Sequence, residues 1–124
     1  MLNDRILCTR VVPMPADLNI NGDVFGGYVL AQMDVAGAIA ARRVTGGRLA
    51  TVAVDSMKFL RPIHAGHIVT LYGQVTKVGT TSVSVQVETF TQKDHEEPEI
   101  LVTEGKFVYV AIDDTGCPRP IDLL

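Results

Sequence analysis

The sequence lacks the features that would place this chain in a membrane or in an oxidising compartment. Only two cysteines occur among 124 residues, Cys8 and Cys117, and they form no CxxC motif. No secretory signal precedes the first apolar segment, so we expect free thiols, a reducing environment and a cytoplasmic location. The most apolar stretch is too short for a transmembrane helix and is interrupted by Gln32 and Asp34. We therefore expect no membrane partner.

Charge and known motifs argue against several further classes of protein. The formal charge of -3, the isoelectric point near 5.5 and the scattered basic residues give no electrostatic case for nucleic acid. No GxSxG, GxxxxGK[ST] or GxGxxG motif occurs, which disfavours serine hydrolase, P-loop and dinucleotide-binding chemistry. His64 and His67 lie three residues apart, but no further cysteine or histidine lies nearby to complete a zinc set. We expect no metal site.

What the sequence does contain describes one compact α+β domain that spans residues 1–124. Hydrophobic residues make up 47% of the chain and charged residues 20%, which is typical of a folded protein. One strand, one long helix and then four strands follow in order, and the short connections between the last four favour antiparallel pairing. The helix is expected to begin between Asp23 and Gly27 and to end near Arg43. The strands are expected at residues 6–12, 49–59, 68–78, 81–92 and 100–112.

The predicted helix is apolar on almost all sides, and Asp34 is the single charge between Tyr28 and Ala41. Such a pattern predicts burial on most sides, so we expect the sheet to wrap around the helix. A sheet of this kind leaves an edge or a face that needs cover, so we also expect self-association. No basic residue lies three or four positions from Asp34, and a lone buried carboxylate is destabilising. Asp34 is therefore either a catalytic residue or the ion-pair partner of an arginine elsewhere in the fold.

Gly26 and Gly27 stand where the predicted helix begins. Without side chains they let a ligand approach the backbone, and the free amide groups and positive dipole end attract negative charge or a developing oxyanion. The alternative is an ordinary helix start that Asp23 caps. Asp34 lies seven residues beyond Gly27, about two helical turns along. The two can share a site only through an extended substrate or through a second subunit.

A chain of motifs resembles the YciA-type acyl-CoA thioesterases of hot-dog fold. The likeness begins at NGDVFGGYVLAQMD and continues through TVAVDSMKFLRPI, KVGTTSVSV and FVYVAID, so it covers most of the chain. It implies a five-stranded antiparallel sheet, with elements in the order βαββββ, wrapped around one long central helix. It also implies a place in lipid metabolism, dimers with the active site across the subunit interface, and hexamers built as trimers of dimers.

Carried over to this sequence, the resemblance gives the catalytic aspartate as Asp34 and the backbone donors as Gly26 and Gly27. Asp23 occupies the position at which related thioesterases have an asparagine that joins the site from the partner subunit. The remaining expected positions are helpers in the loop before the helix or contacts to the CoA phosphates and pantetheine. These positions are Asn19, Asn21, Arg61, Thr80, Thr81 and Ser82.

The reaction that the resemblance implies is hydrolysis of acyl-CoA to a carboxylic acid and free CoA, without a metal or redox cofactor. Asp34 would act as general base on water or attack the thioester itself. One alternative is a hydratase similar to the MaoC type, but that type has a histidine five positions after its aspartate, where this chain has Ile39. The other is a non-catalytic acyl-CoA sensor, although no output module such as a helix-turn-helix is evident.

Overall fold

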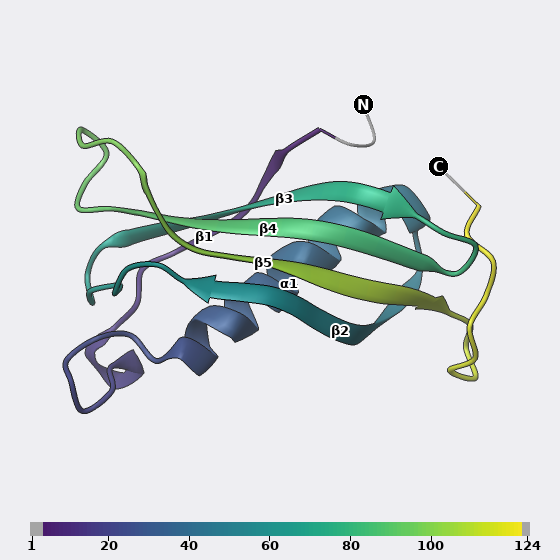
Figure 1. Cartoon of the computed structure of the whole chain (residues 1–124), viewed down its shortest axis with the longest axis horizontal. Coiled ribbons are helices and arrows are strands. Elements are labelled where there is room, and N and C mark those ends of the chain that lie inside the picture. Colours follow the sequence, from purple (N-terminus) through teal and green to yellow (C-terminus); the bar gives the residue numbers. More distant parts are fainter. Residues whose placement is uncertain (1–3, 123–124) are drawn as a thin grey trace.

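The computed structural model describes residues 4–122 and consists of one sheet and one long helix (Figure 1). The order βαββββ is confirmed, and the predicted bounds lie within two residues of those observed. A 3₁₀ turn in the segment before the helix was not predicted. The elements are β1 (Ile6–Val11), the 3₁₀ turn (Pro15–Asp17), α1 (Gly26–Thr45), β2 (Arg48–Phe59), β3 (Ile68–Val78), β4 (Ser82–Gln92) and β5 (Ile100–Ile112).

The five strands form one sheet in the order β1-β3-β4-β5-β2, and all neighbours are antiparallel. The antiparallel expectation is confirmed, but β2 and β3 do not pair with each other. Residues 60–67 instead carry the chain from one edge of the sheet to the strand beside the opposite edge. As a result β2 is an edge strand that pairs with β5 on one side, and no strand of the described residues pairs with its outer side.

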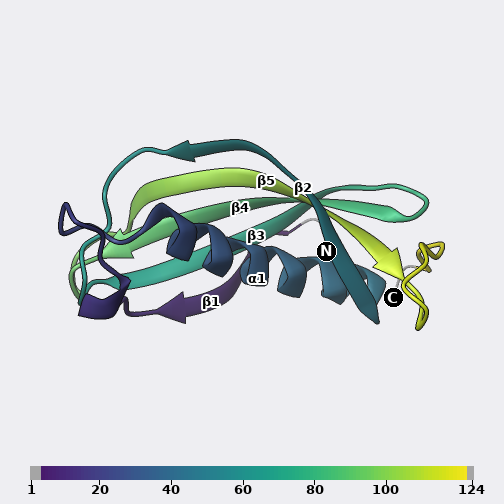
Figure 2. The same cartoon turned by 90° about the horizontal axis from the view of Figure 1, so that it is seen from below.

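The sheet has one dry face and one outward face because apolar and polar side chains alternate along its strands. On β4, Val83, Val85 and Val87 are fully buried, whereas Gln86 and Glu88 are partly exposed. Helix α1 lies along the dry face, as the two views of the fold show together (Figures 1 and 2). Among residues 4–122, no helix or second sheet covers the outward face.

Helix α1 is buried along the side that meets the sheet, at positions that include Met33, Ala36 and Ala40. The expectation that it is buried on most sides is wrong for a single chain, because Val35 is 52% exposed and Ile39 is 38% exposed. These two residues are one turn apart and form an apolar stripe on the side that the sheet does not reach. Wrapping by one sheet covers only part of an all-apolar helix.

Candidate active site

Gly26 and Gly27 form the first turn of α1, as the sequence predicts. The residue that precedes the helix is Phe25, and among the described residues no side-chain hydrogen bond caps the helix start. The expectation that Asp23 caps the helix is therefore wrong; its Oδ1 lies 3.8 Å from Nδ1 of His64 instead. Because no side-chain acceptor occupies the helix start, the backbone amides of the first turn are suited to bind an anionic or polarised oxygen.

The loop that leads into α1 is organised by Asn19. The Oδ1 of this residue accepts hydrogen bonds from the backbone N–H groups of Asn21 (2.8 Å) and Asp23 (3.2 Å). The N–H of Val24 donates to the carbonyl of Ile63 at 2.9 Å, which fixes the loop to the connection after β2. Asn19 thus shapes the loop that presents Asp23, while Asn21 is exposed.

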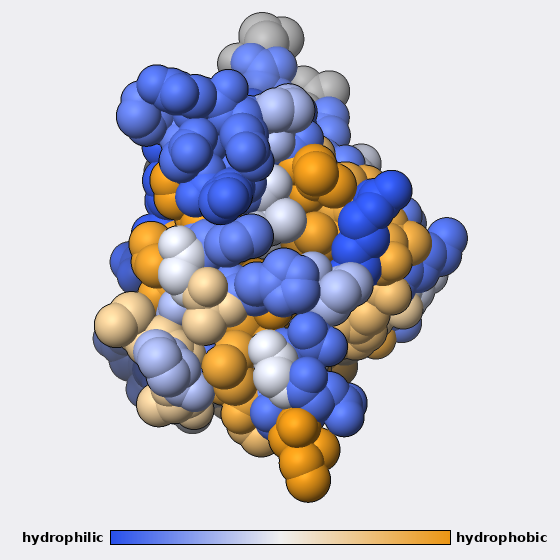
Figure 3. All heavy atoms as spheres, turned by 90° about the vertical axis from the view of Figure 1, so that its left-hand side faces the viewer, coloured by the Kyte–Doolittle hydropathy of each residue, from blue (hydrophilic) through white to orange (hydrophobic). Residues whose placement is uncertain are grey.

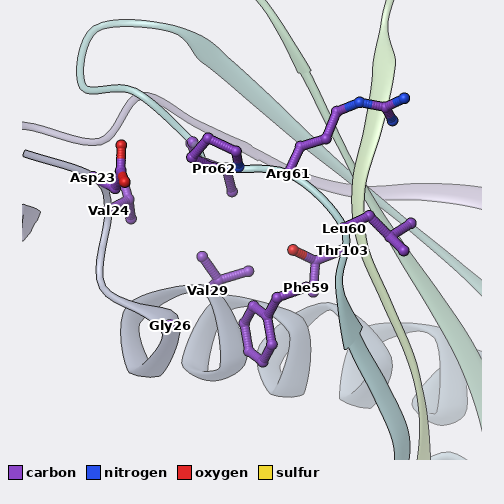
Figure 4. A pocket seen from close by; sticks show the side chains of 10 residues that line it. Asp23, Val24, Gly26, Val29, Phe59, Leu60, Arg61, Pro62 and Thr103 are labelled. Atoms are coloured by element: carbon purple, nitrogen blue, oxygen red, sulfur yellow. The ribbon is translucent and has the colours of Figure 1, made fainter. Parts of the chain in front are cut away.

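A cavity of about 250 Å³ opens beside the helix start (Figure 4). Gly26 and Val29 line it from α1, Phe59 from the end of β2, and Thr103 from β5. Arg61 also lines the cavity, and its Nη1 donates to the carbonyl of Leu101 at 2.9 Å. The surface at this end of the molecule carries apolar patches between polar side chains (Figure 3). The cavity therefore offers apolar walls next to a polar backbone.

Asp34 lies farther along α1, partly buried, and does not line this cavity. The hydroxyl of Thr51 donates to its Oδ1 at 2.8 Å, and the hydroxyl of Tyr109 donates to its backbone carbonyl at 2.8 Å. Thr51 and Tyr109 stand opposite each other in the register of β2 and β5. One cross-strand pair of residues thus binds both the carboxylate and the backbone carbonyl of Asp34.

The alternative in which Asp34 pairs with an arginine is not found in the part of the chain that the structure describes. Its carboxylate is held by the neutral Thr51, which is exposed on the edge strand. Burial raises the pKa of Tyr109 far above its usual range, and the nearby Asp34 carboxylate raises it further. Tyr109 therefore stays protonated and remains a donor, while the Asp34 carboxylate lies at the surface of the single chain.

Sequence reasoning missed both Thr51 and Tyr109. A threonine or a tyrosine in a strand-forming segment carries no marker of a site, and their contact with Asp34 depends on the register of β2 with β5. That register shifts between Thr51 and Ala53, and again between Asp55 and Lys58. Such irregularities are not readable from the alternation of residues.

The residues expected to contact CoA lie at two opposite ends of the sheet. Arg61 lines the cavity, but Thr80, Thr81 and Ser82 lie at the turn between β3 and β4, at the end of the sheet opposite the helix start (Figure 1). Their carbonyl groups bind backbone elsewhere: Thr81 accepts from Ala111 and Thr80 from Ile121, both at 2.8 Å. One chain alone does not bring these residues to the cavity.

Residues 4–122 contain neither a cluster of metal-ligating side chains nor a membrane-spanning helix. No group of three or more histidine, cysteine, aspartate or glutamate side chains there is arranged to hold a metal ion. His64 and His67 contact each other edge to face, with ring centroids 5.4 Å apart. No helix in the same range is long and apolar enough to cross a membrane.

Comparison with known proteins gives consistent matches. The model of the thioesterase superfamily matches residues 21–98, which include Gly26, Gly27 and Asp34. The acyl-CoA thioester hydrolase YciA of Salmonella typhimurium is 46% identical over 118 residues, which cover 93% of this chain and 89% of that protein.

Solved structures of thioesterases match the fold over almost the whole chain. The hexameric thioesterase y2039 from Yersinia pestis has a TM-score of 0.90 at 41% identity, covering 96% of this chain and 97% of that one. An acyl-CoA hydrolase from Staphylococcus aureus, solved with butyryl coenzyme A and coenzyme A, has a TM-score of 0.87 at 28% identity, covering 96% and 72%. The chain therefore belongs to the YciA-type acyl-CoA thioester hydrolases of the thioesterase superfamily and has their hot-dog fold.

Proposed function

We propose that the protein hydrolyses acyl-CoA at a site that two subunits build together, with Gly26 and Gly27 from one and Asp34 from the other. The observation that carries this proposal is the separation of the two parts within one chain. The helix start opens into a cavity that Asp34 does not line, and the Asp34–Thr51 pair lies at the surface instead. A second subunit that covers this surface supplies the missing half of each site.

The surface around Asp34 supports such a dimer. Val35 and Ile39 form the exposed apolar stripe of α1, and Val52 and Val54 on the edge strand are 56% and 41% exposed. An unpaired strand edge beside an apolar patch is a surface that favours association. We propose that the dimers assemble further into a trimer of dimers, in keeping with the hexameric relative from Yersinia pestis.

In the proposed reaction, the amides of Gly26 and Gly27 bind the thioester carbonyl oxygen as it gains negative charge. Donors of this kind contribute about 10²- to 10³-fold each. Thr51 holds Oδ1 of Asp34, and Oδ2 takes a proton from the attacking water. The water oxygen bonds to the carbonyl carbon, the C–S bond breaks, and the proton passes to the CoA thiolate. In the second route, Asp34 attacks the thioester directly: its carboxylate oxygen bonds to the carbonyl carbon, and the C–S bond breaks to give a mixed anhydride and the CoA thiolate. Water then hydrolyses the anhydride, and a proton passes to the thiolate.

The roles of the other predicted residues follow from their positions. Asp23 and Arg61 lie at the rim of the cavity, where they would meet the thioester and the pantetheine arm while the acyl group enters the cavity. Thr80, Thr81 and Ser82 would reach the CoA phosphates only from a neighbouring subunit. The reaction as written uses no metal or redox cofactor, since CoA enters with the substrate and leaves with the product.

We also propose that the whole chain, residues 1–124, acts as one domain and works in the cytoplasm. Cys8 and Cys117 are both free, and Cys117 is exposed, which suits a reducing compartment.

The test of this function is the substitution Asp34→Asn, which keeps the shape of the side chain and removes the base. We expect kcat for butyryl-CoA to fall by about 10²- to 10⁴-fold, with the melting temperature and oligomeric state unchanged. Asp114→Asn, at an exposed position beyond the end of β5, is the control and should retain full activity. An Asp34→Asn enzyme with the kcat of the wild type would refute the proposal.

A further inference from the structure

Thr103 is a buried polar residue at the floor of the cavity beside the helix start. It is 1% exposed, and its hydroxyl oxygen has no hydrogen-bond partner among the described residues. Figure 4 shows this oxygen directed into the cavity, toward the space between Val29 and Pro62. Most buried polar side chains have a partner, and a hydroxyl without one destabilises the fold. The position therefore points to a ligand that supplies the partner.

We propose that Thr103 is a specificity residue, which selects acyl groups that carry a hydroxyl or oxo oxygen near the thioester. This inference rests on the proposed thioester hydrolysis and names a substrate class for it. The Thr103 hydroxyl can both donate to and accept from such an oxygen. It acts on the acyl group and leaves the thioester carbonyl to the amides of Gly26 and Gly27.

The position, volume and lining of the cavity assign it to the acyl end of the substrate. It begins at Gly26, where the carbonyl is held, and its volume of about 250 Å³ is slightly below the roughly 300–1,000 Å³ of typical small-molecule pockets. With the other half of the site supplied by a partner subunit, this space suits the part of the acyl group nearest the thioester. Val29 and Phe59 give it apolar walls, and the charged Asp23 and Arg61 belong to its rim of loop residues.

Within those apolar walls, an unsubstituted acyl chain leaves the Thr103 hydroxyl unpaired. A site with a buried polar group discriminates against the analogue that cannot pair with it. An oxygen on the chain removes this penalty and so raises kcat/KM relative to the unsubstituted substrate. The preference should depend on the hydroxyl and not on the size of residue 103.

A neighbouring residue supplies a matched control. Thr89 on β4 stands directly opposite Thr103 in the sheet register. It is fully buried, and its hydroxyl also lacks a partner, but it does not line the cavity. Replacing either threonine by valine keeps the shape and removes an unpaired buried hydroxyl, so both variants should fold at least as stably as the wild type. Only Thr103→Val should alter the choice of substrate.

The experiment measures kcat/KM for butyryl-CoA and for its 2-hydroxy, 3-hydroxy and 3-oxo derivatives. We expect the wild type to prefer at least one oxygenated substrate over butyryl-CoA. Thr103→Val should reduce that preference, the ratio of the two kcat/KM values, about three- to tenfold, the worth of one neutral hydrogen bond. Thr103→Ser, which keeps the hydroxyl, and Thr89→Val should retain the preference. Melting temperatures verify that all variants are folded.

Each other outcome overturns the inference. If the wild type hydrolyses butyryl-CoA but prefers none of the oxygenated substrates, Thr103 selects nothing and the proposed function stands. If Thr103→Val slows all four substrates equally, its hydroxyl serves the thioester or the fold and not the substituent. If Thr89→Val reduces the preference as much as Thr103→Val, the effect comes from the sheet. If the wild type hydrolyses none of the four, the proposed function fails and this inference fails with it.

Discussion

The hydrogen bond from the Thr51 hydroxyl to Asp34 occupies one of the two carboxylate oxygens and leaves the other without this donor. Oδ1 accepts a hydrogen bond from the Thr51 hydroxyl at 2.8 Å, so the side chain is held in one orientation and Oδ2 is left for the proposed role as base. Small displacements of a catalytic group are costly, since a misplacement of about 1 Å reduces rates roughly 100-fold. An arginine partner would offset the negative charge of Asp34. The neutral Thr51 hydroxyl orients the carboxylate and leaves its charge in place.

This arrangement predicts that Thr51 positions Asp34. Thr51→Val removes the donor at nearly constant shape, and we expect kcat for butyryl-CoA to fall about 10- to 100-fold with KM little changed. Thr51→Ser keeps the donor and should stay within about threefold of the wild type. Steady-state kinetics measures both. Equal kcat values for the valine and serine variants would show that the hydroxyl has no positioning role.

At the scale of elements, α1 and β5 are held together by a close approach at one glycine. A Cβ atom at Gly37 would overlap the hydroxyl of Tyr109, which donates to the carbonyl of Asp34 at 2.8 Å. At Gly27 in the same helix, a Cβ would meet nothing within 4 Å. The first glycine is required by packing and the second is not, although both lie in one helix.

We therefore predict that Gly37→Ala lowers the free energy of unfolding by about 1–3 kcal/mol through overpacking. Gly27→Ala, the matched control, should leave stability unchanged or slightly raised, because alanine is the better helix former. Adding Tyr109→Phe to Gly37→Ala removes the overlapping hydroxyl, so the double variant should lose less stability than the sum of the two single variants.

Urea unfolding at one fixed protomer concentration measures these differences, because the stability of an oligomer depends on concentration. Strictly additive effects of Gly37→Ala and Tyr109→Phe would contradict the contact.

The elements themselves were predictable from sequence, but their neighbours were not. Alternation such as that of Val83, Val85 and Val87 gave the strand bounds to within two residues. The pairing of β2 with β5 and its irregular register, including Ser56 at a φ of 55°, depend on tertiary packing. Gly26, Gly27 and Asp34 stand in motifs that the sequence shows, so they are candidates from sequence alone. Thr51 and Thr103 become candidates only in the structure, because strand pairing decides what they face.

At the scale of the whole molecule, the exposed surface of one chain fits a site shared between subunits. In a two-fold dimer each contact occurs twice, so the proposed dimer would have two equivalent sites, each with the helix start from one subunit and Asp34 from the other. A chain that lacks only Asp34 can then serve a partner that lacks only the helix start. A site built within one chain does not allow this.

This difference predicts complementation between two inactive variants. Asp34→Asn removes the base, and Gly27→Leu fills the space in front of the helix-start amides, where an added Cβ would meet none of the described residues within 4 Å. When the two are co-expressed in equal amounts and fill the proposed hexamer as three randomly paired dimers, about one quarter of the sites are intact, whereas a doubly tagged dimer alone would have about one intact site in two. We therefore expect about a quarter of wild-type kcat per subunit, measured with butyryl-CoA on protein purified through a different tag on each variant.

The controls separate true complementation from residual activity. Each variant co-expressed with itself should remain inactive, and the two purified separately and mixed briefly should not recover unless subunits exchange. Size-exclusion chromatography with light scattering verifies that the doubly tagged protein has the assembly of the wild type. If that protein is assembled and no more active than its parents, both halves of the site belong to one chain, because every such chain then carries one defect.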